Sequence, residues 1–148
     1  FLASGKLKEA TGAKLALHRD DLFLWDMLEE QCRMFGIPFE KPPPPDQWLE
    51  HEEEIEVKGV QGKALHTPGH TPGSMCFLFE KQKLLIAGDT LFQGSIGRTD
   101  LWGGDYQQIE KSIQEKLYTL DEETSVITGH GESTSIGHEM RSNSFVRA

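Results

Sequence analysis

The chain has 148 residues, which fits one domain of common size and excludes a multidomain protein within these residues. Its formal net charge of −9 disfavours binding to nucleic acid or anionic membranes, because both require clustered Lys and Arg. No stretch approaches the ~20 apolar residues of a membrane-spanning helix, and no secretory signal is recognisable. Two isolated cysteines, Cys32 and Cys76, predict reduced, buried thiols and a cytoplasmic location.

The N-terminal third predicts two helices with one short strand between them. Residues 4–10 are typical of the end of a helix, with Gly12 as its stop, and residues 13–17 predict a buried strand. A second helix is expected to start near Asp20 or Asp21, since either carboxylate can cap its first amides. The apolar stripe of that amphipathic helix comprises Trp25, Leu28, Cys32 and Phe35.

The middle of the chain predicts strands. Residues 55–60 and 63–66 are short apolar runs separated by turn glycines, which indicates a hairpin. Residues 75–79 and 84–87 are two further strand candidates, joined by a polar turn at residues 80–83. This part is therefore expected to supply most of a sheet.

The C-terminal part predicts helices alternating with a strand. After a glycine-rich loop at residues 93–104, Asp105 is expected to cap a helix, with Gln108 as its capping-box partner. The buried positions of that helix recur at a spacing of four: Ile109, Ile113 and Leu117. A last strand at residues 125–128 and a last helix at residues 136–145 complete an α/β domain.

Three polar residues follow apolar runs and lie on rigid turns. His70 lies between two Pro-Gly turns, Asp89 follows Gly88 at the end of a strand, and His130 lies between two glycines. Taken singly, each residue is typical of an ordinary turn. Because each follows a strand, we expect the three at one edge of the sheet, where imidazoles and a carboxylate can bind a transition metal.

The order of these turns resembles the second half of the metallo-β-lactamase superfamily of metal-dependent hydrolases. Within that superfamily, the chain is most similar to the small hydroxyacylglutathione hydrolases, the glyoxalase II-like branch. The similarity also covers residues 32–36, residues 45–49 and the ending from Gly129 to Asn143. The resemblance implies an α/β fold, the C-terminal portion of a metallo-β-lactamase αββα sandwich.

The resemblance also implies roles for the three turn residues. His70 would bind a first metal, Asp89 would bridge two metals and His130 would bind the second, which makes all three catalytic. Two zinc ions are expected, with iron or manganese as alternatives. The implied reaction is hydrolysis of a thioester, such as an S-acylglutathione, by a metal-bound hydroxide.

One part of the family pattern is missing from these residues. The His-x-His-x-Asp-His turn, which supplies most ligands of the first metal in relatives, does not occur. We therefore expect residues 1–148 to be a single partial domain lacking its N-terminal strands. Phe1 and Leu2 match the register that follows the missing turn in relatives. Roughly 60 more residues are expected before Phe1, from the typical size of a complete domain.

Substrate residues are less completely matched. Arg98 occupies the basic position that grips glutathione in relatives, but Asp100 replaces a tyrosine two positions later. Arg98 therefore has two interpretations, a substrate contact or an ion pair with Asp100. His66, on the strand before His70, is either an ordinary strand residue or a support for the metal ligand.

Two alternative functions remain open. Residues 97–100, Gly-Arg-Thr-Asp, are similar to a loop of persulfide dioxygenases, which use one iron ion. Here His70 and Asp89 would supply two of the three iron ligands. A chain that truly lacks the first metal-binding turn would instead be a metal-free scaffold or binding module. The expected partner of the enzyme is a small-molecule substrate, with no nucleic acid and no membrane.

Overall fold

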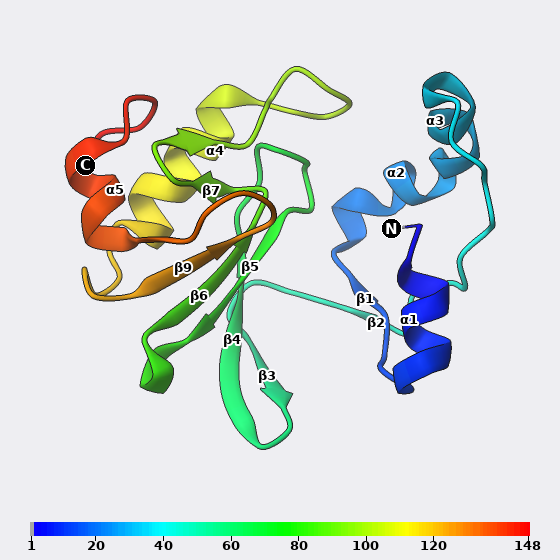
Figure 1. Cartoon of the computed structure of the whole chain (residues 1–148), viewed down its shortest axis with the longest axis horizontal. Coiled ribbons are helices and arrows are strands. Elements are labelled where there is room, and N and C mark those ends of the chain that lie inside the picture. The colour runs from blue at the N-terminus through cyan, green and yellow to red at the C-terminus, as the bar shows by residue number, and fades with distance from the viewer. Residues whose placement is uncertain (1) are drawn as a thin grey trace. The chain divides into compact units, whose positions relative to one another are not determined.

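The computed structural model describes residues 2–148, which form two compact units (Figure 1). The first unit reaches Leu49, and the second runs from Glu50 to Ala148. Phe1, which was predicted with Leu2 to follow the missing metal-binding turn, lies outside the described residues. Among residues 2–148, no helix is long and apolar enough to cross a membrane.

The first unit holds three short helices and a two-stranded parallel ladder. Its elements are α1 (Ser4–Thr11), β1 (Ala16–Leu17), α2 (Leu22–Asp26), α3 (Leu28–Phe35) and β2 (Gln47–Trp48). As predicted, α1 ends at Gly12, whose backbone is left-handed. The strand is shorter than the predicted residues 13–17, because Ala13 and Lys14 are exposed and only the last two residues pair with β2.

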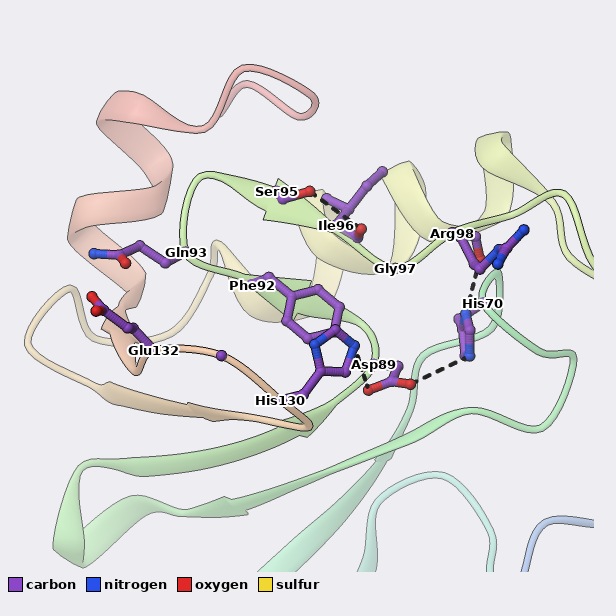
Figure 2. A pocket seen from close by; sticks show the side chains of 11 residues that line it. His70, Asp89, Phe92, Gln93, Ser95, Ile96, Gly97, Arg98, His130 and Glu132 are labelled. Atoms are coloured by element: carbon purple, nitrogen blue, oxygen red, sulfur yellow. Dashed lines mark hydrogen bonds and ion pairs between the residues drawn. The ribbon is translucent and has the colours of Figure 1, made fainter. Parts of the chain in front are cut away.

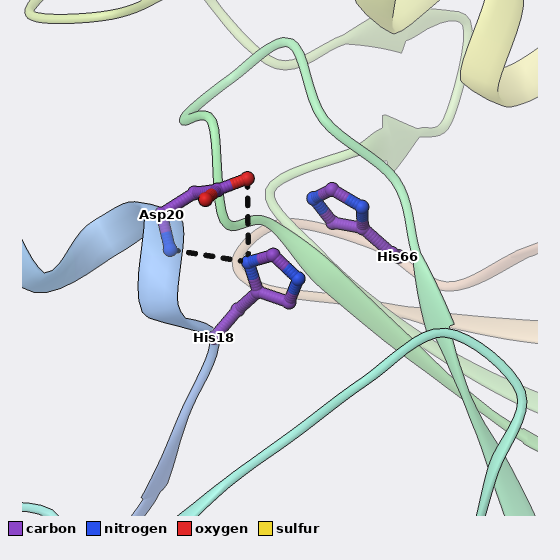
Figure 3. A group of neighbouring side chains, drawn as sticks. All are labelled: His18, Asp20 and His66. Carbon is purple, nitrogen blue, oxygen red and sulfur yellow. Dashed lines mark hydrogen bonds and ion pairs between the residues drawn. The ribbon is translucent and has the colours of Figure 1, made fainter.

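The second helix differs from its prediction in two ways. It is divided at Met27 into α2 and α3, after a 3-10 turn at Arg19–Asp21. The predicted aspartate cap is wrong, because His18 has an extended backbone and its Nδ1 accepts a hydrogen bond from the Asp20 amide, 3.3 Å away (Figure 3). Of the predicted stripe, three residues are buried and Phe35 is 60% exposed.

The second unit is built on a six-stranded sheet with the order β10-β9-β6-β5-β4-β3. Strands β6 and β9 are parallel, and every other neighbouring pair is antiparallel. The strands are β3 (Glu53–Val57), β4 (Val60–His66), β5 (Met75–Phe79), β6 (Leu84–Gly88), β9 (Ser125–Thr128) and β10 (Thr134–Ser135). The predicted hairpin, the two middle strands and the last strand are thereby confirmed.

The turn of the β3–β4 hairpin is displaced from its predicted place. It lies at Lys58 and Gly59, both with positive φ, whereas Gly62 lies inside β4. Two successive residues with positive φ make the turn that suits the twist of a two-stranded ribbon. Gly62 is instead a packing position, since a Cβ there would lie 2.8 Å from the ring of Phe79.

Two helical segments cover one face of this sheet (Figure 1). Helix α4 (Tyr106–Ser112) continues into a π-helical turn at Ile113–Leu117, and α5 (Ile136–Ser142) follows β10. The last helix is shorter than predicted, because Asn143 is extended and its Oδ1 accepts from the amides of Phe145 and Val146. The core between helices and sheet includes Leu65, Cys76, Leu85, Ala87, Ile109, Ile113, Leu117, Val126 and Ile136.

The predicted cap of α4 is confirmed with one change. Asp105 Oδ1 accepts from the Gln108 amide at 3.1 Å, as expected of an N-cap. The Gln108 side chain donates to Asp105 Oδ2, not to the backbone. The Asp105 amide donates instead to the Gly69 carbonyl at 2.8 Å. The cap therefore also contacts the loop that carries His70.

A small hairpin that the sequence did not predict spans the start of the glycine-rich loop and the two residues before it. Strand β7 (Leu91–Phe92) pairs with β8 (Ser95–Ile96). The hairpin is fixed to α5 by the fully buried Glu139, whose Oε2 accepts from the Gly94 amide at 2.9 Å. Asn143 adds a hydrogen bond from Nδ2 to the Ser95 carbonyl at 3.1 Å.

Candidate metal centre

The three turns identified in the sequence lie at one edge of the six-stranded sheet. Strands β6 and β9 run parallel, so the residues that follow them, Asp89 and His130, leave the sheet on the same side. Strand β5 is antiparallel to β6, so the β4–β5 loop with His70 reaches that edge as well. The expected co-location is confirmed.

Asp89 lies between the two imidazoles (Figure 2). Its Oδ2 is 3.6 Å from His70 Nε2, and its Oδ1 is 3.9 Å from His130 Nε2. Each carboxylate oxygen thus faces a different histidine. About 39% of the Asp89 side chain is exposed, so it is open to a ligand from solvent.

Two glycines allow the backbone to approach Asp89 closely. A Cβ at Gly129 would lie 2.1 Å from Asp89 Oδ1, and one at Gly97 would lie 1.9 Å from the Asp89 carbonyl oxygen. Since real Cβ atoms do not come so close, any larger residue would displace the turn or the carboxylate. Gly97 and Gly129 are therefore required by the geometry around Asp89.

Hydrogen bonding sets the orientation of His70. Its Nδ1 lies 2.8 Å from the Arg98 carbonyl, and a carbonyl can only accept, so Nδ1 carries the proton. Nε2 of the neutral ring is then the unprotonated nitrogen, and it faces Asp89. His66 supports the same loop, since its Nε2 donates to the Pro72 carbonyl at 2.7 Å.

A buried pair of hydroxyls joins the His70 loop to the Asp89 turn. Thr67 Oγ1 and Thr90 Oγ1 are 3.1 Å apart, and both residues are buried. Cys76 lies beside them as the predicted free thiol, and burial raises its pKa. Hydrogen bonds in such a dry environment restrict movement of both turns.

The donor set fits divalent transition metals. Two ligand atoms of a tetrahedral zinc ion, each about 2.0–2.1 Å from the metal, are about 3.4 Å apart. The His70–Asp89 and His130–Asp89 separations of 3.6 and 3.9 Å are close to that value. Small movements would let one cation bind on each side of the carboxylate, although each side has only one imidazole and one carboxylate oxygen among the described residues.

A cavity of about 430 Å³ opens over this constellation. It is lined by His70, Asp89, Phe92, Gln93, Ser95, Ile96, Gly97, Arg98, His130, Gly131 and Glu132 (Figure 2). The ring of Phe92 packs against the ring of His130, with centroids 4.5 Å apart. Phe92 was not predicted as a site residue, and its place soon after Asp89 was the available signal in the sequence.

Arg98 forms an ion pair with Asp100, which is one of the two roles that the sequence left open for Arg98. Nε and Nη2 donate to the two carboxylate oxygens, both at 2.8 Å. The hydrogen bonds from Arg98 lower the pKa of Asp100 to about 2, so the pair persists at neutral pH. Arg98 lines the cavity, and both side chains of the pair are largely exposed, which leaves Arg98 able to exchange partners.

The fold and the cluster of His70, Asp89 and His130 define an α/β protein with a candidate metal centre at one edge of its sheet. Comparison with known proteins identifies its family: residues 1–130 match the model of the metallo-beta-lactamase superfamily. Hydroxyacylglutathione hydrolase GloC of Haemophilus influenzae is 41% identical over 148 residues, an alignment that covers 99% of this chain and 70% of that protein. The chain belongs to the metallo-β-lactamase superfamily, which confirms the predicted family and fold class.

Two crystal structures agree with this assignment. The BLEG-1 B3 metallo-beta-lactamase superposes with a TM-score of 0.89 at 36% identity, covering 99% of this chain and 71% of that one. TTHA1623 in a di-iron-bound form gives a TM-score of 0.86 at 36% identity, covering 98% and 71%. The superfamily membership indicates a metal-dependent hydrolase.

Proposed function

We propose that this chain forms the second half of a metal-dependent thioester hydrolase, with an S-acylglutathione as the substrate class. His70 binds one metal, Asp89 bridges two, and His130 binds the other. The observation that carries the proposal is the Asp89 carboxylate, with one oxygen toward each histidine. Similarity to the Haemophilus hydroxyacylglutathione hydrolase supports the substrate class.

The chain's own residues hold the reacting groups. Two divalent ions, when bound, would lower the pKa of a water molecule and polarise the substrate carbonyl. The Arg98 carbonyl fixes the tautomer of the neutral His70 ring in which Nε2 carries no proton, the form that a metal ligand requires. The Phe92 ring packs against the ring of His130 and limits its movement.

The proposal includes two zinc ions, because imidazole and carboxylate ligands suit zinc. The same donors suit iron and manganese, and the relative with a di-iron centre supports iron. The His-x-His-x-Asp-His turn is not among these residues. We therefore propose the activity for a polypeptide in which this chain is joined to such a turn.

The proposed partner is a small-molecule thioester, not a nucleic acid or a membrane, in keeping with the net charge of −9. Arg98, the cationic residue of the cavity lining, is proposed to contact a carboxylate of the substrate after leaving Asp100. The proposed location is the cytoplasm, which the two free cysteines favour.

The second candidate is a mononuclear iron enzyme similar to persulfide dioxygenases. It is favoured by the loop at residues 97–100, whose arginine and aspartate pair while its backbone orients His70. In that case His70 and Asp89 would hold one iron ion, and His130 would hold none.

One experiment separates these functions. Metal content and S-acylglutathione hydrolysis are measured on the full-length protein, beside oxygen uptake with glutathione persulfide. We expect two metal ions per chain and hydrolysis. One iron ion with oxygen uptake would support the dioxygenase, and a protein without metal or activity would support a degenerate scaffold.

A further inference from the structure

The loop that carries His70 is attached by three hydrogen bonds to α4, its N-cap and the π-helical turn that follows it. We call residues 66–70 the His70 loop. Lys116 Nζ donates to the His66 carbonyl, and Ser112 Oγ donates to the Pro68 carbonyl at 2.8 Å. The Asp105 amide donates to the Gly69 carbonyl at 2.8 Å. Three of the loop's backbone acceptors are thus bound by one helical segment.

The loop backbone also lies directly on this helix. A Cβ on Gly69 would be 2.3 Å from the Ile109 backbone nitrogen, so no side chain separates the two backbones. Ile109 is fully buried in the core. The position of α4 is therefore transmitted to His70 through rigid contacts.

The two side-chain donors come from the part of the helix where its geometry changes. Ser112 is the last residue of α4, and Lys116 lies in the π-helical turn Ile113–Leu117. The Tyr118 amide closes that turn by donating to the Ile113 carbonyl at 2.8 Å. π-Helical turns are rare and occur frequently at functional sites.

Neither Ser112 nor Lys116 makes the contact that is usual for its residue type on a surface helix. Ser112 is buried and donates across to the loop, where a helical serine often bonds within its own helix. Lys116 is partly buried, and that burial lowers its pKa. Lys111, one turn earlier, is exposed and lies 4.0 Å from Glu115. Lys116 thus gives up solvation to bind the loop.

We propose that Ser112 and Lys116 are positioning residues, which fix the His70 loop so that His70 Nε2 is held toward Asp89 for metal binding. The proposal rests on the proposed metal site. It predicts that removing either donor weakens the metal on the His70 side and leaves the metal beside His130 bound as before.

The test is a cobalt(II) titration of the full-length protein, followed by visible absorption. The variants are Ser112→Ala and Lys116→Met, which delete one donor each. Lys116→Arg retains a donor, and Lys111→Met is the matched control on the exposed side of the same helix. Thermal unfolding of each metal-free variant is measured separately.

We expect one of the two cobalt ions to bind about 10-fold more weakly in both deletion variants, the lower end of effects seen when a supporting contact is lost. Its absorption bands should shift, while Lys116→Arg and Lys111→Met stay close to wild type. Unchanged cobalt affinity and spectra would overturn the proposal, even if the metal-free variants unfold at lower temperature. Equal weakening of both ions would also overturn it.

The wild-type titration separates this proposal from the proposed function. A wild-type protein that binds no cobalt would overturn the metal site and the positioning role together. A wild type that binds two ions but hydrolyses no thioester would contradict only the substrate assignment, and the cobalt comparison would still decide the positioning role.

Discussion

At the residue scale, Gly129 packs tightly against the Asp89 carboxylate. A methyl group at position 129 would lie 2.1 Å from Asp89 Oδ1, so Gly129→Ala must displace the carboxylate. We expect roughly a 10- to 100-fold loss of metal affinity, the range seen when ligand geometry is disturbed. Isothermal titration with zinc measures it. Gly59→Ala is the control for backbone strain alone, because its φ is 83° but a Cβ there would meet nothing within 4 Å.

The Arg98–Asp100 pair gives a second prediction at this scale. Asp100→Asn removes the charge that holds the guanidinium, so Arg98 becomes free to bind a substrate carboxylate. The KM for an S-acylglutathione should fall roughly 2- to 5-fold with kcat unchanged, the size of one exposed charge pair. Steady-state kinetics checks it. Asp121→Asn, which breaks a similar exposed pair with Lys83, should leave KM unchanged.

The juxtaposition of the three turns could be predicted from the sequence, but the contacts that support them could not. His70, Asp89 and His130 were found because turn residues and strand ends are local signals. Phe92 and Lys116 are ordinary residues in the sequence, and their contacts depend on how separate elements meet. The pairing of Arg98 with Asp100 was one of two open interpretations, since the sequence holds both partners but not their geometry.

At the element scale, the cap of α4 predicts a pH effect. Hydrogen bonds from Gln108 lower the pKa of Asp105. Its ionised form therefore stabilises the fold above the ordinary aspartate pKa near 3.9, and that contribution is lost as pH falls through the lowered value. Asp105→Ala should lower the urea midpoint at pH 7. The difference from wild type should shrink below about pH 4, and a difference independent of pH would contradict the charged cap.

Helix α5 fixes the small β7–β8 hairpin through Glu139, which is fully buried. Its carboxylate accepts from the Thr134 hydroxyl, the Gly94 amide and the Asn143 side chain. Glu139→Gln replaces one acceptor oxygen by a donor, so at least one buried hydrogen bond is lost. We expect a loss of about 2–3 kcal/mol in the free energy of unfolding, measured with urea. The exposed Glu115→Gln should change it by less than about 0.5 kcal/mol.

The elements themselves were predictable where periodicity and caps are strong. Strands β5 and β6 and the start of α4 were located correctly, because apolar runs and Asp105 mark them. The break at Met27 and the imidazole cap at His18 were not, since no propensity rule distinguishes them from a continuous helix. Two-residue strands such as β7 and β8 are too short to show alternation.

At the scale of the whole molecule, the site depends on the order of strands in one sheet. The parallel pair β6–β9 brings Asp89 and His130 together, and the antiparallel β4–β5 loop adds His70. The same arrangement explains why residues far apart in the chain form one constellation. Family membership could be predicted because those turns occur in a fixed order, whereas the complete ligand set could not be assembled from these 148 residues.

The most direct test of the central claim is the metal content of the full-length protein, with and without Asp89→Ala, measured together with S-acylglutathione hydrolysis. Asp89 faces both histidines, so its loss should reduce bound metal from two ions per chain to one or none. Hydrolysis should fall at least about 100-fold, because the metal charge that would stabilise the transition state is lost with the carboxylate. If Asp89→Ala retained both the metal and the rate of wild type, the assignment of this site would be wrong.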